Sequence, residues 1–502
     1  MDTSFILIGL QQALSLQNIF LIALGAAIGI IVGALPGLSA TMALALLLPI
    51  TFPLAPDSGL AMLAALYLSA MYGGSIAAII LRTPGTPAAA ATVMDGYPMG
   101  ARGEAGKALG FSLTASMVGG FISGIALLTV APMLGSLVLM FGPLELFAIA
   151  TLGITMIGTL SRGSAVKGLF SGALGLLLAM VGMDPVTGTA RFAFDNINLY
   201  SGISYTVALI GMFSIPQAIA LAQDARHEQA PLNKLGGRVL PTLREFIQML
   251  PNALRSGVIG TVVGVLPGSG GETASWFAYN EAKRWAKPKD KEKFGTGYSQ
   301  GIVAPEAANN AVVGGALVPT IALGIPGSST TAVMLGALMV HGILPGPTLL
   351  TDHGDITYTL IWAVILANIP LFIFGLAMTR IGILVTRIPK MIVAVSIVVL
   401  AIVGTLAINN NMFDVWLMLG FGLLGYVFDR ADVPVAPIVI GLVLGMLLDI
   451  SLAQSLIIGQ DSWSVFTRSP LAMGILAVAG LSILQATPIF RVLFKRKNKK
   501  EN

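Results

Sequence analysis

The stretch GTVVGVLPGSGGETAS, residues 260–275, decides the fold. Apolar sequence surrounds it, but a helix cannot continue through its middle, because Pro267 lacks a backbone N–H and three glycines follow within four residues. A broken backbone within a membrane is tolerated only where protein or a water-filled cavity satisfies the freed N–H and C=O groups. The stretch therefore predicts a helix break that lines a cavity.

Two kinds of break each occur twice in the chain. The stretch GIIVGALPGLSATMAL, residues 29–44, repeats the first kind, and its Pro36 lies 231 positions before Pro267. The second kind, Pro84-Gly85-Thr86, returns 242 positions later as Pro326-Gly327-Ser328. Discontinuous helices that recur in two related halves are typical of secondary transporters.

The composition indicates an integral membrane protein. The 502 residues are 55% hydrophobic and 10% charged, whereas soluble domains carry roughly 25% charged residues. At about 20 apolar residues per crossing, we expect an all-α polytopic protein with about 10–14 transmembrane segments, some of them Pro-Gly broken helices or hairpins. The chain has no cysteine, which excludes disulfides, thiol catalysis and cysteine metal sites.

The longest polar interval divides the chain into two membrane halves. The predicted domains are a first membrane repeat at residues 1–223, a polar linker at 224–250, a second repeat at 251–490 and a basic tail at 491–502.

The distribution of basic residues predicts that the two halves have inverted topology. After the first kind of break, residues 53–59 carry no Lys or Arg, whereas residues 283–293 carry six. After the second kind the bias reverses, because Arg102 and Lys107 follow the first copy and residues 341–355 contain neither Lys nor Arg. Positively charged loops stay cytoplasmic, so equivalent loops are expected on opposite sides. The net charge of +5 thus reflects topology and not nucleic-acid binding, and the basic tail is expected in the cytoplasm.

The break regions offer the groups that bind a small anion. A helix that restarts after a break directs its first N–H groups at a ligand, and its N-terminus carries about half a positive charge. Hydroxyls add hydrogen bonds, and glycines expose the backbone. The alternative is that each Pro-Gly pair only kinks a packed helix. The candidate substrate-binding residues are Gly37, Ser39, Thr41, Arg82, Thr83, Gly85, Thr86, Gly268, Ser269, Gly270, Thr273, Gly327, Ser328, Ser329 and Thr330.

Arg82 adjoins the second kind of break, and two interpretations stay open. Its guanidinium is suited to a substrate carboxylate, which it would hold with two hydrogen bonds. Alternatively, it extends to the membrane interface and orients the helix.

Four polar residues are candidates for ion coupling: Glu272, Glu306, Asn309 and Asn310. Ionisable groups within membrane spans are usually functional, and neutral oxygens near a break suit Na⁺. The alternatives are interhelical hydrogen bonding by the two asparagines and an interfacial position for Glu272.

Long motifs in the chain resemble one transporter family. They are VGALPG at 32–37, AMYGGSIAAIILRTPG at 70–85, GVLPGSGGETASWFAYNEAKR at 264–284, FGTGYSQGIVAPEAANNA at 294–311 and VPTIALGIPGSSTTAVMLGAL at 318–338. Together they resemble the large membrane subunit (TctA-type) of the tripartite tricarboxylate transporters over essentially the whole chain. One departure is Arg82, where a small polar residue is expected, and it leaves the identity of the carboxylate open.

The resemblance implies a permease in the bacterial inner membrane that imports small carboxylates, driven by a Na⁺ or H⁺ gradient and without a cofactor. It also implies two partners, a small four-helix membrane subunit (TctB-type) and a soluble periplasmic solute-binding protein (TctC-type). Lipid, the small subunit or a second copy of the chain is expected to cover the apolar outer faces.

Two other functions compete with this interpretation. A passive channel or facilitator for small organic anions would use the same breaks without ion-coupled accumulation. A membrane enzyme is disfavoured, because His227, His341 and His353 are scattered and no Gly-rich phosphate loop ending in Gly-Lys-Ser/Thr is present.

Overall fold

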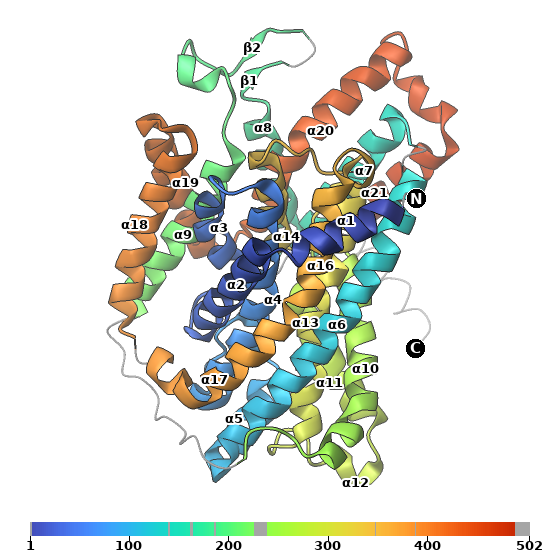
Figure 1. The fold of residues 1–502 in the computed structure, drawn as a ribbon. Coiled ribbons are helices and arrows are strands. Elements are labelled where there is room, and N and C mark those ends of the chain that lie inside the picture. The colour runs from blue at the N-terminus through green and yellow to red at the C-terminus, as the bar shows by residue number, and fades with distance from the viewer. Residues whose placement is uncertain are drawn as a thin grey trace, which may run out of the picture.

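The computed structural model describes residues 3–138, 141–160, 164–184, 187–224, 238–346, 348–386 and 388–486, and these are mostly helical (Figure 1). The helices before residue 225 are α1 (Thr3–Ala13), α2 (Leu16–Ala34), α3 (Ala40–Thr51), α4 (Pro56–Leu81), η1 (Pro87–Ala89), α5 (Val93–Met99), η2 (Gly100–Glu104), α6 (Ala105–Val138), α7 (Pro143–Leu160), α8 (Ala165–Ala179), η3 (Ile197–Leu199) and α9 (Tyr205–Asp224). Strands β1 (Gly182–Met183) and β2 (Ala190–Arg191) form a small antiparallel hairpin between α8 and α9.

The later helices lie between residues 243 and 486. They are α10 (Leu243–Val265), α11 (Gly270–Trp285), α12 (Pro288–Lys291), α13 (Ser299–Leu323), α14 (Ser329–Val340), α15 (Leu349–Asp352), α16 (Gly354–Leu366), α17 (Asn368–Thr386), α18 (Lys390–Asn409), α19 (Met412–Arg430), α20 (Ala436–Ile458), η4 (Trp463–Arg468) and α21 (Pro470–Ala486).

Within the described ranges, eight helical stretches are long and apolar enough to cross a membrane, and six shorter apolar helices accompany them. The long stretches are Leu16–Ala34, Pro56–Leu81, Val93–Ser136, Tyr205–Asp224, Gly354–Arg380, Lys390–Asn409, Met412–Arg430 and Ala436–Ile458. The shorter ones include α3 and α14, which follow breaks. The prediction of an all-α polytopic membrane protein is confirmed.

The first kind of break has the same geometry in both halves. Helix α2 ends before Pro36 and α3 begins after it, just as α10 and α11 flank Pro267. The glycine after each proline has a positive φ, 91° at Gly37 and 80° at Gly268. This left-handed conformation is available to glycine at little cost, so each Pro-Gly pair both stops one helix and turns the chain into the next.

The second kind of break also recurs. Helix α4 ends at a left-handed residue, Arg82 with φ 59°, and α13 ends at Gly324 with φ 69°. These two residues are 242 positions apart, the same separation as Pro84 and Pro326.

Glycines let the backbones of the two kinds of break approach closely. A Cβ added to Gly85 would lie 2.1 Å from the carbonyl oxygen of Gly33, and a Cβ added to Gly327 would lie 2.7 Å from that of Gly264. Gly33 and Gly264 are 231 positions apart, so the same contact forms in each half. The second break of each half therefore packs directly on the helix that precedes the first break.

The helices outside the breaks also pair in corresponding ways. Helix α9 packs against α18 and α19, while α20 packs against α7 and α8. We call these six helices the outer helices; α9, α18 and α19 lie at the left of Figure 1, and α7, α8 and α20 lie toward its top.

Loops of similar charge from the two halves lie together. Arg102 donates hydrogen bonds of 2.6 Å to the carbonyls of Thr296 and Gly297, which joins the basic regions of the two halves near α5 and α12 (Figure 1). The loops without Lys or Arg also meet, because a Cβ added to Gly59 would lie 3.0 Å from Nε2 of His341. Inverted topology requires this pairing, and the inverted relation itself stays a prediction.

The predicted linker at 224–250 includes the start of a helix. Helix α10 begins at Leu243 with a capping box in which Thr242 and Glu245 bond each other's backbone N–H groups. Residues 225–237 of the predicted linker, and the predicted tail at 491–502, lie outside the described residues. The division into repeats remains a prediction.

Gly85→Ala should destabilise the protein, because the new methyl group would overlap the Gly33 carbonyl. Overpacking of this kind typically costs about 1–3 kcal/mol, and thermal unfolding of the purified protein in detergent should shift to lower temperature. Gly420→Ala on α19 is the matched control, since a Cβ there meets nothing within 4 Å. Equal unfolding temperatures for the two variants would contradict the tight contact.

Candidate binding cavity

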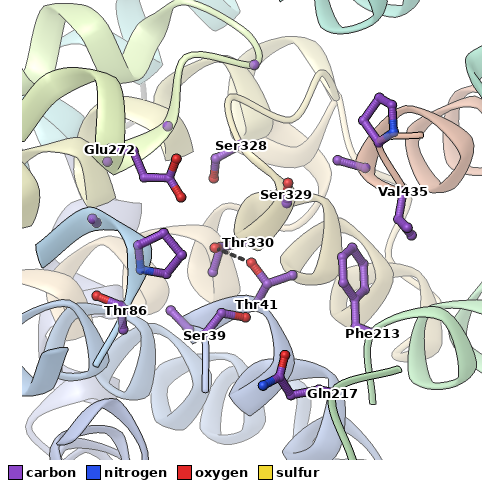
Figure 2. A pocket seen from close by; sticks show the side chains of 18 of the residues that line it. Ser39, Thr41, Thr86, Phe213, Gln217, Glu272, Ser328, Ser329, Thr330 and Val435 are labelled. Atoms are coloured by element: carbon purple, nitrogen blue, oxygen red, sulfur yellow. Dashed lines mark hydrogen bonds between the residues drawn. The ribbon is translucent and has the colours of Figure 1, made fainter. Parts of the chain in front are cut away.

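A cavity of about 480 Å³ lies where the broken helices of both halves meet. Its lining includes Ser39 before α3, Ser269 and Gly270 at the start of α11, and Ser328 before α14. Figure 2 shows the labelled hydroxyl side chains of this lining. Three helices therefore begin at the wall of this cavity.

The N-termini of these helices differ in how they are capped. Ser39 accepts a hydrogen bond of 3.2 Å from the N–H of Met42, and Ser328 accepts one of 3.2 Å from the N–H of Thr331. At α11 the cap residue Ser269 instead donates its hydroxyl to the carbonyl of Leu266 at 2.8 Å, and α11 has no side-chain cap. The first N–H groups of a helix lack partners within that helix, so α11 presents N–H groups without a side-chain cap at the cavity, and its first turn also carries the acidic Glu272.

Hydroxyl groups connect the two halves across the cavity. Oγ1 of Thr41 and Oγ1 of Thr330 are hydrogen bonded at 2.8 Å, although the residues are 289 positions apart. The hydroxyl of Tyr67 on α4 contacts Oγ of Ser328 at 3.4 Å. The dashed bond between Thr41 and Thr330 lies near the centre of Figure 2.

The lining carries acidic but no basic side chains. Glu272 and Asp429 are its charged residues, and no Lys or Arg is among the described residues that line it. Positive potential in the cavity therefore comes from helix N-termini.

Comparison with known proteins identifies the family. Residues 19–440 match the model described as the Tripartite tricarboxylate transporter TctA family. The chain belongs to this family. It is accordingly a multi-pass membrane subunit of a tricarboxylate transporter, and not an enzyme.

Two relatives of this TctA-family chain come from Agrobacterium vitis. An uncharacterized 52.8 kDa protein in the TAR-I ttuC' 3'region is 35% identical over 471 residues, which cover 94% of this chain and 93% of the relative. An uncharacterized protein in the TAR-II ttuC' 3'region is 34% identical over 227 residues, which cover 45% of this chain and 93% of that relative. No solved structure matches the chain.

Most of the predicted substrate residues lie at the cavity of this TctA-family chain. Those in the lining are Ser39, Thr41, Thr86, Gly268, Ser269, Gly270, Thr273, Ser328, Ser329 and Thr330, together with the predicted ion-coupling residue Glu272. Gly37, Gly85 and Gly327 are outside the lining and shape the backbone beside it. For example, the carbonyl of Gly327 accepts a hydrogen bond of 2.9 Å from the N–H of Gly268.

Arg82 and Thr83 do not reach the cavity. Both are exposed, and the Arg82 guanidinium lies over the ring of Tyr97, 5.6 Å from its centre. This position fits the interfacial interpretation of Arg82 better than a substrate contact.

The sequence interpretation missed lining residues on continuous helices. Tyr67 on α4 and Gln217 on α9 both line the cavity, and Gln217 donates a hydrogen bond to the carbonyl of Gly37. The sequence did contain a signal for Tyr67. It lies 242 positions before Asn309, a predicted ion-coupling residue, and this is the separation between the two copies of the second kind of break.

The other predicted ion-coupling residues are fully buried in α13, outside the lining. The carboxylate of Glu306 accepts hydrogen bonds from Thr92, from Ser112 at 2.9 Å and from Ser116 at 3.1 Å. Nδ2 of Asn309 donates to the carbonyl of Met71, and Nδ2 of Asn310 donates to that of Leu68, both at 3.2 Å. The two asparagines thus hydrogen bond α13 to α4, which is the arrangement expected if they serve to join neighbouring helices.

Glu306→Ala should strongly destabilise the protein, because it leaves three buried hydroxyls without their acceptor. Leaving a buried donor unsatisfied costs about 1–3 kcal/mol, so the loss of this shared acceptor should make the protein unfold in detergent at much lower temperature. Glu306→Gln keeps an acceptor oxygen, so its unfolding temperature should fall less than that of Glu306→Ala. The exposed Glu292→Ala is the control, and a loss in Glu306→Ala no larger than in that control would contradict the structural role.

Substrate should protect Ser329 but not Thr83 from chemical modification. The chain has no native cysteine, so Ser329→Cys and Thr83→Cys each introduce a single reporter. A transported carboxylate should slow the reaction of a thiol reagent with Ser329→Cys several-fold and leave Thr83→Cys unchanged. Protection of position 83 alone would place the substrate at Arg82 instead.

Proposed function

We propose that this chain is the permease subunit of a binding-protein-dependent transporter that imports small carboxylates across the bacterial inner membrane, driven by an ion gradient. The observation that carries the proposal is the cavity at which α3, α11 and α14 begin. Its volume of about 480 Å³ is within the range of roughly 300–1,000 Å³ typical of small-molecule sites.

The chemistry of the cavity supports an anionic substrate with several oxygens. Helix N-termini supply N–H donors and positive potential, and the hydroxyls of Thr41, Ser329 and Thr330 supply further hydrogen bonds. Because no basic side chain lines the cavity among the described residues, selectivity rests on the backbone and on hydroxyl groups.

The two acidic residues in the lining support coupling to a cation. Glu272 and Asp429 would repel a carboxylate in a cavity shielded from water. A co-bound Na⁺, or a proton on one of these carboxylates, reduces that repulsion. Substrate and cation then bind best together, which is the requirement for symport.

Transport in this proposal follows from movement of the broken helices against the outer helices. The two halves act as inverted repeats. Breaking and re-forming the hydrogen bond between Thr41 and Thr330 opens the cavity to one side of the membrane and then to the other. A small membrane subunit and a periplasmic solute-binding protein complete the transporter, and the C-terminus is cytoplasmic.

Uptake into proteoliposomes tests the proposal and its alternative, a passive facilitator. The vesicles contain this chain with its small subunit and binding protein, and a panel of radiolabelled di- and tricarboxylates is supplied with an inward Na⁺ gradient, an inward H⁺ gradient or neither. We expect accumulation of at least one acid above equilibrium, abolished by an ionophore that dissipates the gradient and by omission of the binding protein. Equilibration without accumulation under every gradient would support the facilitator.

A further inference from the structure

Helix α10 turns large apolar side chains outward and small ones inward. The outward residues, which are 46–75% exposed, are Leu243, Ile247, Leu254, Val258 and Val262. The buried side includes Ala253, Ser256, Gly257, Gly260 and Gly264. Membrane helices associate through small residues, and a Cβ added to Gly260 would lie 2.2 Å from the carbonyl oxygen of Ala308 on α13. The small residues of α10 therefore serve its contacts within the protein, and its outward side has the composition of a lipid-facing surface.

Helix α11, which packs against α10, carries exposed aromatic side chains beside this surface. Trp276, Phe277 and Trp285 are 38%, 51% and 69% exposed. The guanidinium of Arg255 on α10 lies over the ring of Trp285, 5.5 Å from its centre. Tryptophan is enriched at the boundary between the membrane and water, so Trp285 indicates that this boundary lies at the end of α11.

Basic residues follow Trp285 along the chain. Residues 281–293 contain six Lys or Arg and three Asp or Glu. Arg284 pairs with Glu281, and Lys293 pairs with Asp290. Four exposed lysines form no ion pair with a described residue: Lys283, Lys287, Lys289 and Lys291. Helix α12 of this segment lies at the bottom of Figure 1, at the end that the charge distribution predicts to be cytoplasmic.

Two guanidinium groups share one carboxylate at the end of α11. The indole N–H of Trp285 donates a hydrogen bond of 2.8 Å to Glu281, and Nη1 of Arg284 donates one of 3.3 Å to the same carboxylate. The bond from Trp285 lowers the pKa of Glu281, and the charges of Arg284 and Arg255 lower it further. One carboxylate cannot neutralise both guanidinium groups, so positive charge remains beside the Trp285 ring.

We infer that this surface binds an anionic phospholipid. The phosphate of its headgroup lies among Arg255, Arg284 and Lys287, beside Trp285, and its acyl chains lie along the outward side of α10. Guanidinium groups bind phosphate with paired hydrogen bonds. Clusters of roughly four to eight Lys or Arg next to a membrane helix attract anionic lipids.

A lipid fits this surface better than a second protein chain does. A partner helix would need small residues on the outward side of α10, but the glycines and serine of α10 face inward. A phospholipid supplies both a phosphate for the basic residues and apolar chains for the exposed Leu, Ile and Val side chains.

The inference goes beyond the proposed transport, because it concerns the lipid around the protein. Helix α11 extends from Gly270 at the cavity to Trp285 at the lipid surface. A bound headgroup therefore restrains the helix whose first turn forms part of the cavity wall.

Binding of phosphatidylglycerol to the purified full-length chain tests the site. Thermal unfolding is followed in detergent as phosphatidylglycerol or the zwitterionic phosphatidylcholine is added, and native mass spectrometry counts the bound lipids. We expect phosphatidylglycerol alone to raise the unfolding temperature. Each basic residue near an anionic lipid surface changes affinity about fivefold, so the half-saturating concentration should rise by at least about tenfold in the triple variant Arg255→Gln, Arg284→Gln, Lys287→Gln.

Arg430→Gln is the matched control for Arg255→Gln. Arg430 also lies over an aromatic ring, 5.3 Å from the centre of Tyr426, but it belongs to α19. Arg430→Gln should keep the wild-type half-saturating concentration within about twofold, whereas Arg255→Gln should raise it about fivefold. Each variant is compared with its own unfolding temperature without lipid, so that a loss of stability is not counted as a loss of binding.

Three results would overturn the site. They are an equal response to phosphatidylcholine, an unchanged response in the triple variant, and an equal response to inorganic phosphate, which would show a phosphate site that needs no lipid. If the triple variant keeps phosphatidylglycerol but loses the small membrane subunit, the surface is a protein interface and the lipid assignment is wrong. Carboxylate uptake enters none of these measurements, so failure of the proposed transport would leave the outcome unchanged.

Discussion

Each helix break frees backbone N–H and C=O groups that lipid cannot satisfy, and the structure depends on how these groups find partners. The N–H of Gly85 donates to the carbonyl of Gly74 at 3.0 Å, and the N–H of Gly268 donates to that of Gly327 at 2.9 Å. Such bonds require backbones to approach without side chains between them. The glycines at the breaks are therefore required by the structure. The helices that restart after the breaks, α3, α11 and α14, begin at the cavity.

Helix ends and acidic side chains act in opposite directions on a bound anion. The N-termini of α3, α11 and α14 attract it, while Glu272 and Asp429 repel it. A cavity lined by a guanidinium would bind a carboxylate without help from a second ion. A cavity that balances helix N-termini against carboxylates gains affinity when a cation enters, and this dependence is what an ion-coupled transporter needs.

Much of the cavity could be predicted from the sequence, because a Pro-Gly pair ends its helix through the backbone geometry of those two residues alone. Pro36 and Pro267 are each followed by a glycine with a positive φ, so the helix ends there and the hydroxyl residues that follow lie at helix starts. The position of Arg82 could not be predicted in this way. The residue is next to a break in sequence, but a left-handed turn at the end of α4 directs it outward to Tyr97. Tyr67 and Gln217 were missed because they reach the cavity through tertiary packing of continuous helices.

The central claim is that the carboxylate binds at the helix N-termini. An experimental structure of the protein with a transported carboxylate and Na⁺ tests it most directly. The account predicts density for the acid between the starts of α3, α11 and α14, with its carboxylate oxygens within hydrogen-bond distance of the first N–H groups of α11. Density for the acid beside Arg82, with the cavity filled only by water, would contradict it.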